Sequence, residues 1–222
     1  MAETTSKALV WDQDTQRIYE TGVEKGVLYV KKDDGTYDVG VAWNGLTGVT
    51  ESPSGAEPTA LYANNKKYLN LMSAEEFGGT IEAYTYPDAF AACNGEAELQ
   101  AGVTIGQQPR KGFGFSYKTL IGNDAQGDAY GYKIHIVYNC LVSPSEKAYE
   151  TVNESPNANE MSWEFTTTPV DVEGGKPTSI VTINSTKVVA AKLKALEDML
   201  YGTAETDPTL PTIAEIAELF KA

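Results

Sequence analysis

Apolar and polar residues alternate along several stretches of the chain, and this period of two is the pattern of half-buried β-strands. The clearest stretch is 131–141, which predicts a strand with one apolar face and one mostly polar face. Its apolar set is Tyr132, Ile134, Ile136 and Tyr138, and the other set is Lys133, His135, Val137 and Asn139. Residues 160–166 follow the same rule, because Met161, Trp163 and Phe165 alternate with polar residues. Both stretches therefore predict strands of an amphipathic sheet.

Turn residues between strand-like runs predict two hairpins. Residues 26–32 and 37–43 flank an Asp-Asp-Gly turn, and Asp-Gly between two apolar runs favours a tight hairpin. Residues 113–120 and 131–141 flank a second polar turn. Shorter strands are expected at 68–72, 79–86 and 179–183, with one or two helical turns at 87–93. The pattern as a whole predicts a mainly β fold.

Residues 45–67 lack any clear periodicity and are rich in Gly, Pro, Ser, Thr and Asn. A segment of this length inside a compact domain is either disordered or functional, so we expect a long loop. Residues 73–76 resemble the first turn of a short helix, because acidic residues such as Glu75 and Glu76 are favoured there by the helix dipole.

The C-terminal segment, about 187–222, is the part predicted to be helical. A first helix is indicated by four residues on one stripe, Val189, Leu193, Leu196 and Leu200. Gly202 is the expected stop of this helix. Thr212 and Glu215 match a capping box, which predicts a second, shorter helix. Since no internal repeat or domain boundary is visible, residues 1–222 are expected to form a single domain.

Composition and charge narrow the classes of function. Thirteen Tyr, three Trp and six Phe favour strands. The net charge of −14 argues against binding to nucleic-acid phosphates, which needs basic patches, but suits a surface past which DNA slides. Cys93 and Cys140 are too few for a disulfide-rich secreted scaffold, and free buried thiols are favoured over a single disulfide.

No targeting or membrane segment is expected. Residues 1–6 have neither a basic nor an apolar stretch of the kind that signal peptides carry. No apolar run approaches the ~20 residues that span a bilayer. We therefore expect synthesis in a cytoplasm and no membrane partner.

Residues with catalytic or metal-binding potential are few. His135 is the one histidine, a histidine metal site needs further ligands, and no Gly-x-Ser-x-Gly nucleophile elbow exists. Residues 112–117 begin like a dinucleotide fingerprint but lack the third glycine, and their alternating aromatics favour a strand. Adjacency of Glu75 and Glu76 does not supply the spatial separation of a glycosidase pair. We therefore expect no enzymatic activity and no cofactor.

Two binding alternatives stay open at this point. Asn123, Asp124 and Asp128 carry oxygen atoms that calcium prefers, but their spacing differs from an EF-hand and the same residue types favour turns. We favour the turn. The tyrosine-rich strands are compatible with a β-sandwich module that binds carbohydrate or a receptor, although aromatics also pack cores and subunit interfaces.

Eight segments, in order and over nearly the whole chain, resemble one family. They are 43–47 (WNGLT), 51–58 (ESPSGAEP), 71–77 (LMSAEEF), 82–88 (EAYTYPD), 102–108 (GVTIGQQ), 120–124 (LIGND), 143–149 (SPSEKAY) and 165–170 (FTTTPV). The chain is similar to the major tail proteins, or tail tube proteins, of long non-contractile bacteriophage tails, especially of siphophages that infect Gram-positive bacteria. Residues 210–213 depart from the proline-rich approach to the terminal helix that the resemblance implies.

The resemblance implies a tail-tube β-sandwich or barrel with a flanking α-helix and a C-terminal short helix. Six copies would close into a ring, the inner sheets would join into one ring-wide β-barrel, and rings would stack into a tube. Implied partners are other copies of the chain, a tape-measure protein in the lumen, and the tail terminator and distal tail or baseplate proteins. DNA would pass through without specific binding. The implied location is the virion, after assembly in the host cytoplasm, and no catalytic residues are carried over.

Two sets of residues are candidates for these roles. The loop is expected to reach a neighbouring ring, and its candidate contacts are Glu51, Ser52, Pro53, Ser54, Gly55, Ala56 and Glu57. The candidate lumen-facing residues are Glu82, Glu160, Ser162, Glu164 and Thr166. An outer sheet with a solvated polar side remains the alternative for the second set, because alternation does not distinguish one solvated face from another.

Overall fold

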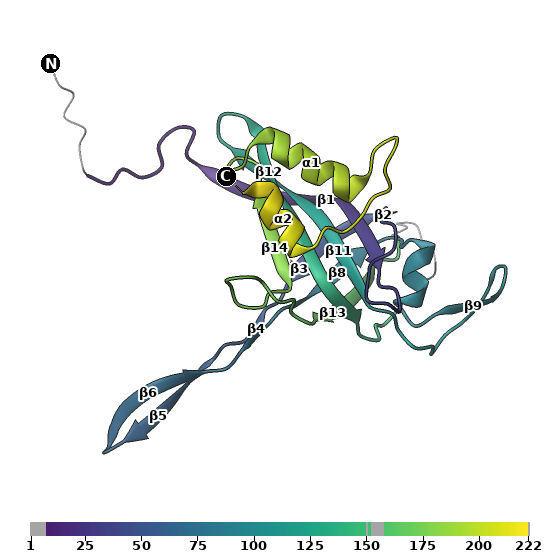
Figure 1. The fold of residues 1–222 in the computed structure, drawn as a ribbon, viewed down its shortest axis with the longest axis horizontal. Coiled ribbons are helices and arrows are strands. Elements are labelled where there is room, and N and C mark those ends of the chain that lie inside the picture. The colour runs from purple at the N-terminus through teal and green to yellow at the C-terminus, as the bar shows by residue number, and fades with distance from the viewer. Residues whose placement is uncertain (1–7, 150, 152–157, 222) are drawn as a thin grey trace.

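A computed structural model describes residues 8–149, 151 and 158–221 (Figure 1). Residues 1–6, considered above for a signal peptide, lie outside this range. The strands are β1 (Ile18–Val30), β2 (Val41–Trp43), β3 (Leu46–Glu51), β4 (Ser54–Gly55), β5 (Pro58–Ala63), β6 (Lys66–Met72), β7 (Glu75–Glu76), β8 (Gly78–Ala83), β9 (Ala97–Gln100), β10 (Val103–Ile105), β11 (Phe113–Asn123), β12 (Gly127–Val142), β13 (Met161–Thr167) and β14 (Ile180–Asn184). The helices are the 3-10 helix η1 (Asp88–Ala92), α1 (Ala190–Tyr201) and α2 (Ile213–Phe220).

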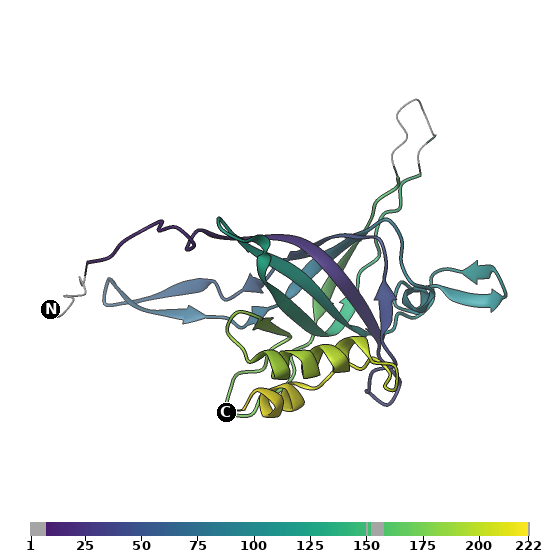
Figure 2. The same ribbon diagram turned by 90° about the horizontal axis from the view of Figure 1, so that it is seen from above.

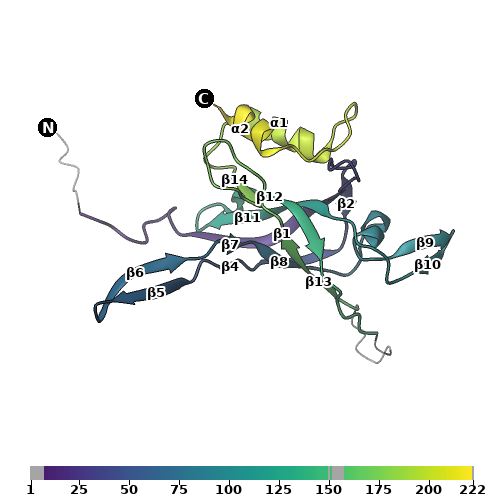
Figure 3. The same cartoon turned by 60° about the horizontal axis from the view of Figure 1, so that its bottom comes forward.

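One antiparallel sheet folds over on itself to form two layers. Its strand order is β2-β1-β11-β12-β13-β8-β3, with β14 also paired to β12. The long strand β12 joins the layers, because Lys133–Val137 pairs with β14 whereas Cys140–Val142 pairs with β13. Helices α1 and α2 cover the layer of β1, β11, β12 and β14 on its other side (Figure 3). The prediction of a mainly β sandwich with flanking helices is confirmed, and within the described residues the sheet does not close into a barrel.

The core between the two sheet layers is aromatic. Trp163 and Phe165 of β13 meet Phe113 and Phe115 of β11 in one buried cluster, to which Trp43 also belongs. The rings meet edge to face, for example at 5.7 Å between Trp43 and Trp163. Edge-to-face pairs stabilise the core beyond the contribution of the area that they bury. The alternating aromatic residues of the sequence therefore form the core between the two layers.

A second core lies between the sheet and the helices. Leu193, Leu196 and Leu200 of α1 pack in it, and the Tyr29 hydroxyl donates a hydrogen bond of 2.7 Å to the Leu200 carbonyl. The predicted stop is confirmed, because Gly202 takes a φ of 73°.

At the two helix N-termini the structure confirms one prediction and corrects another. The capping box of Thr212 and Glu215 is present at the start of α2. Val189 was expected on the buried stripe of α1. It instead precedes the first helical turn and is 63% exposed, so that expectation was wrong.

The hairpin of β11 and β12 is confirmed, but its predicted polar face is wrong. His135 and Val137 are buried, because the layer of β3, β8 and β13 covers the side that alternation assigned to solvent. The first hairpin is confirmed in part. β1 pairs with β2 through Gly26–Leu28, whereas β1 itself begins at Ile18, before the apolar run.

The predicted loop at 45–67 is wrong, and so is the helix start at 73–76. Residues 46–51 form β3, the sheet edge beside β8, and residues 52–76 form a projecting two-stranded ribbon, here called the arm. In the arm β4 pairs with β7 and β5 pairs with β6. The arm leaves the body at one end of the molecule, and the β9–β10 hairpin leaves it at the other (Figure 2). Backbone pairing across the arm explains why a segment without apolar periodicity still forms strands.

Candidate assembly surfaces

The five candidate lumen residues lie on a single face of the sandwich. In antiparallel pairing, residues directly opposite each other share a face. Ser162 lies opposite Glu82, and Glu164 lies opposite Thr80, in the register of β13 and β8. Their neighbours Trp163 and Ile81 point into the core instead. We call the solvent side of β3, β8 and β13 the outer face.

Two contacts hold acidic side chains across the outer face. The Thr47 hydroxyl on β3 donates a hydrogen bond to the Glu160 carboxylate at the start of β13. The carboxylate of Glu82 lies over Gly48, where an added Cβ would come within 2.7 Å of its Oε2 atom. A glycine at this position therefore lets the acid lie flat across the neighbouring strand.

The outer face is acidic and carries no compensating cation from its own strands. β3, β8 and β13 contain no Lys, Arg or His, while Glu82 projects from β8, Glu164 projects from β13 and Glu160 directly precedes β13. Phosphate contacts in proteins come chiefly from Lys and Arg. A polyanion near this face would meet repulsion and hydroxyl groups, with no ionic contact from these strands.

Glu51 lies at the root of the arm but is engaged inside its own subunit. Its Oε1 accepts a hydrogen bond of 2.6 Å from the Tyr117 hydroxyl and lies 3.2 Å from Nδ1 of His135. The Tyr117 and His135 rings stack with their centroids 4.6 Å apart. Glu51 was expected to contact a neighbouring ring. The structure shows it fixing the end of β3 to the sandwich.

The protonation of His135 follows from this arrangement. Burial lowers the pKa of His135 and Lys133 lowers it further, while the nearby Glu51 and Glu20 carboxylates act in the opposite direction. The Thr119 hydroxyl lies 3.0 Å from Nε2. A neutral ring that donates from Nδ1 to Glu51 and accepts at Nε2 from Thr119 satisfies both nitrogens. The direction of the pKa shift agrees with that neutral form.

The rest of the predicted stacking segment lies in the proximal part of the arm. Ser54 and Gly55 form β4 and pair with Glu76 and Glu75, and the Ser52 amide donates to the Gly78 carbonyl at 2.8 Å. Pro53, Ala56 and Glu57 complete this part of the arm, whose residues are exposed apart from the half-buried Ala56. These residues build the stem of the arm, and its apolar side chains lie further out.

Two projecting segments contain none of the candidate contact residues, although β5 lies within the predicted loop at 45–67. One is the distal arm, β5 and β6, and the other is the β9–β10 hairpin. The turn of the distal arm, Asn64-Asn65, takes φ values of 51° and 60°, and asparagine is one of the residues that tolerate this backbone. That Asn-Asn pair between two strand-like runs was the available signal.

The possible calcium ligands and the two cysteines take structural roles in the fold. The Asn123 side chain accepts hydrogen bonds from the amides of Ala125 and Gln126, as in a turn, and Asp128 accepts from the Tyr19 hydroxyl, so the turn interpretation is confirmed. Cys93 and Cys140 are free and buried, as predicted. Burial raises the pKa of the Cys93 thiol to about 12.

Within 8–149, 151 and 158–221, no group of three or more His, Cys, Asp or Glu side chains is arranged to hold a metal ion. No helix in the same residues has the length and apolarity to cross a membrane.

Comparisons with known proteins find likeness among solved structures. No protein-family model matches the sequence, and no curated protein matches it. Among solved structures, the chain is similar to a chain of the anti-feeding prophage baseplate, determined by cryo-EM with six-fold symmetry. The TM-score is 0.36 and the identity 7%, over 72% of this chain and 92% of that one. A score and identity this low leave the function to be inferred from the chain's own residues.

Proposed function

We propose that this chain is the structural subunit of a phage tail tube, in which copies close into hexameric rings and rings stack around a lumen. The observation that carries the proposal is the outer face, an exposed three-stranded surface with acids, hydroxyls and no cation of its own. Such a wall lets a polyanion pass, because no lysine or arginine on it would trap phosphates. The resemblance of the sequence to tail tube proteins supports the same function.

The free edge of the sheet supports association of copies. β3 ends the strand order, so one row of its backbone groups lacks a strand partner within the described residues. Exposed edges are templates for pairing with another chain, and closure of a ring removes them. In the proposed ring, the outer face of each of the six copies points toward the ring axis. Together these faces form one continuous wall around the lumen.

The resemblance to tail tube proteins also suggests the partners. A tape-measure protein would fill the lumen until DNA passes, and the tail terminator and distal tail or baseplate proteins would contact the two ends of the tube. The protein would be a virion component assembled in the host cytoplasm, without enzymatic activity or cofactor.

Electron microscopy of the purified full chain tests assembly. Negative staining at high protein concentration should show rings or tubes. Sedimentation that detects only monomer at every concentration, with the baseplate-proximal initiator also present, would contradict the proposal.

A charge reversal in assembled phage tests the lumen assignment. Glu82→Lys with Glu164→Lys should leave tubes intact but slow DNA ejection at low salt, with recovery as salt rises, because new phosphate contacts are screened. The matched control is Glu205→Lys with Asp207→Lys, an equal charge change at exposed positions after α1. Equal ejection rates in both variants at low salt would place the two acids outside the channel.

The alternative of a carbohydrate- or receptor-binding module has less support. Three tyrosines of the long strands are packed in the cores: Tyr29 and Tyr117 are at most 2% exposed and Tyr138 is 4% exposed. Tyr62 and Tyr68 are exposed, but they lie on the distal arm and not on a face of the sandwich.

A further inference from the structure

The distal arm is a ribbon that has no core of its own. Its exposed large apolar residues are Leu61, Tyr62, Tyr68, Leu69, Leu71 and Met72, with Tyr62 and Tyr68 each 73% exposed. A two-stranded hairpin alone is marginally stable in water, and clustered exposed apolar side chains mark a contact surface. The distal arm is therefore built to be covered by a partner.

The positive charge of the distal arm favours a partner surface that is acidic. Residues 58–72 hold Lys66 and Lys67 and no acid, a charge of +2 in a chain of net −14, so the remaining residues carry −16. Two arms side by side would bring four lysines together, and like charges in close contact are unfavourable. The arm therefore fits an acidic part of a second copy better than it fits another arm.

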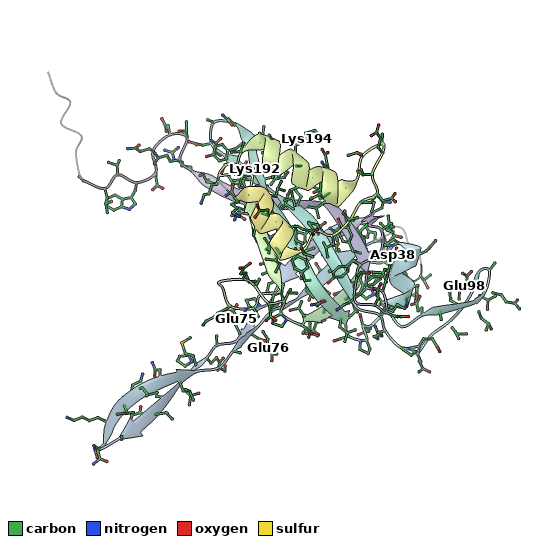
Figure 4. All side chains as sticks on the ribbon, in the orientation of Figure 1. Asp38, Glu75, Glu76, Glu98, Lys192 and Lys194 are labelled. Carbon is green, nitrogen blue, oxygen red and sulfur yellow. The ribbon has the colours of Figure 1, made fainter. Side chains whose placement is uncertain are left out.

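The opposite end of the molecule offers such a part. The β9–β10 hairpin is a separate two-stranded sheet with exposed Leu99, Val103 and Ile105, and Glu98 is the one charged residue in 97–105. Figure 4 shows Glu98 and Asp38 at the end of the molecule opposite the arm, whose root is marked by Glu75 and Glu76. The two apolar projections therefore lie at opposite ends and differ in charge.

We infer that the distal arm of one copy docks on the β9–β10 hairpin of the next copy, with the Lys66–Lys67 tip beside Glu98. This inference rests on the proposed self-assembly and names the two surfaces that meet. Because the surfaces differ, the contact is heterologous, and a heterologous contact that does not close into a ring propagates as a filament. The tube would then lengthen by the same pair of surfaces at every step.

Cross-linking of engineered cysteines tests the pairing. Ala63→Cys at the end of β5 and Ala101→Cys in the β9–β10 turn are exposed positions, whereas the native Cys93 and Cys140 are fully buried. Assembled full chain that carries both substitutions, treated with a short bis-maleimide, should give a ladder of dimers, trimers and longer oligomers. Each single variant alone should remain monomeric on a denaturing gel, and a mixture of the two should give one dimer band.

Two results would overturn the inference while the tube remains. A strong dimer band from Ala63→Cys alone would show that arms meet arms. Tubes without a ladder from the double variant would show that the arm docks elsewhere. A wild-type chain that never assembles would instead remove the proposed function, and the inference with it.

Charge reversal adds an independent measurement. Lys66→Glu with Lys67→Glu should raise the critical concentration for assembly about tenfold or more, which corresponds to about 1.4 kcal/mol per contact. Lys192→Glu with Lys194→Glu makes the same change on α1, away from both projections (Figure 4), and should leave the critical concentration unchanged. An equal effect of the two pairs would refute a specific role for the arm tip. Glu98→Lys added to the arm variant should restore assembly in part, and no restoration would count against Glu98 as the partner.

Discussion

Two antiparallel hairpins of this chain, β11–β12 and β5–β6, have opposite environments. The first is buried on both faces, with Phe115 and Tyr117 toward the other sheet layer and Ile134 and Ile136 toward the helices. The second projects from the body, and every residue of β6 is exposed. Both are paired antiparallel along their length, each with at least one register shift, so pairing alone does not decide what a hairpin contributes.

The two hairpins differ in how much apolar burial stabilises each of them in the monomer. Apolar area removed from water contributes about 25 cal/mol per Å², and β11–β12 removes such area on two sides. The distal arm removes little within the monomer, so its apolar side chains can contribute only when a partner covers them. One hairpin thus stabilises the folded monomer, and the other contributes little to that stability.

Truncation of an aromatic residue in each hairpin should separate the two roles. Phe115→Ala in the core should lower the free energy of unfolding by about 3–5 kcal/mol, because a fully buried ring is lost. Tyr68→Ala in the arm should change it by less than about 0.5 kcal/mol and yet reduce assembly. Urea titration of the monomer measures the first quantity, and light scattering measures the second. A large loss of stability from Tyr68→Ala would show that the arm belongs to the folded core.

The helix layer should behave like the core hairpin. Leu196→Ala is expected to cost about 2–5 kcal/mol, since this side chain is fully buried between α1 and the sheet. Val189→Ala, at the exposed position before α1, is the matched control and should cost less than about 0.5 kcal/mol. Thermal unfolding compares the two variants, and equal melting temperatures would contradict the docking of α1.

A smaller effect should come from the hydrogen bond at the arm root. Tyr117→Phe removes the hydroxyl that donates to Glu51 and should cost about 1–2 kcal/mol. Tyr62→Phe removes an exposed hydroxyl in the arm and should be neutral within about 0.5 kcal/mol. If Tyr117→Phe is equally neutral by urea titration, the Glu51 contact does not stabilise the root.

The smallest effect concerns pH. Burial lowers the pKa of His135 in the folded protein, so the unfolded chain binds a proton more readily. This contribution to stability should be complete above the unfolded pKa of about 6.5 and should be lost as pH falls below it toward the folded value. His135→Gln should therefore show a smaller loss of melting temperature between about pH 7.5 and about pH 5. A steeper loss in the variant would contradict the neutral assignment.

The sequence by itself determined where several strands and helices begin and end. Alternation at 131–141 and 160–166 predicted β12 and β13, the capping box predicted the start of α2, and Gly202 predicted the end of α1, because each depends on near neighbours in the chain. The period-two alternation along residues 160–166 likewise placed four residues on one face, namely Glu160, Ser162, Glu164 and Thr166.

Only the tertiary structure decided which faces meet solvent. His135 and Val137 lie on the side that alternation assigned to water, and they are buried because a second layer folds over them. Residues 45–67 lack periodicity because the distal arm is exposed on both sides, so its strands follow from backbone pairing and leave no apolar pattern. The contacts of Glu51 inside its own subunit were likewise decided by the tertiary structure, because Tyr117 and His135 reach it from strands far away in the sequence.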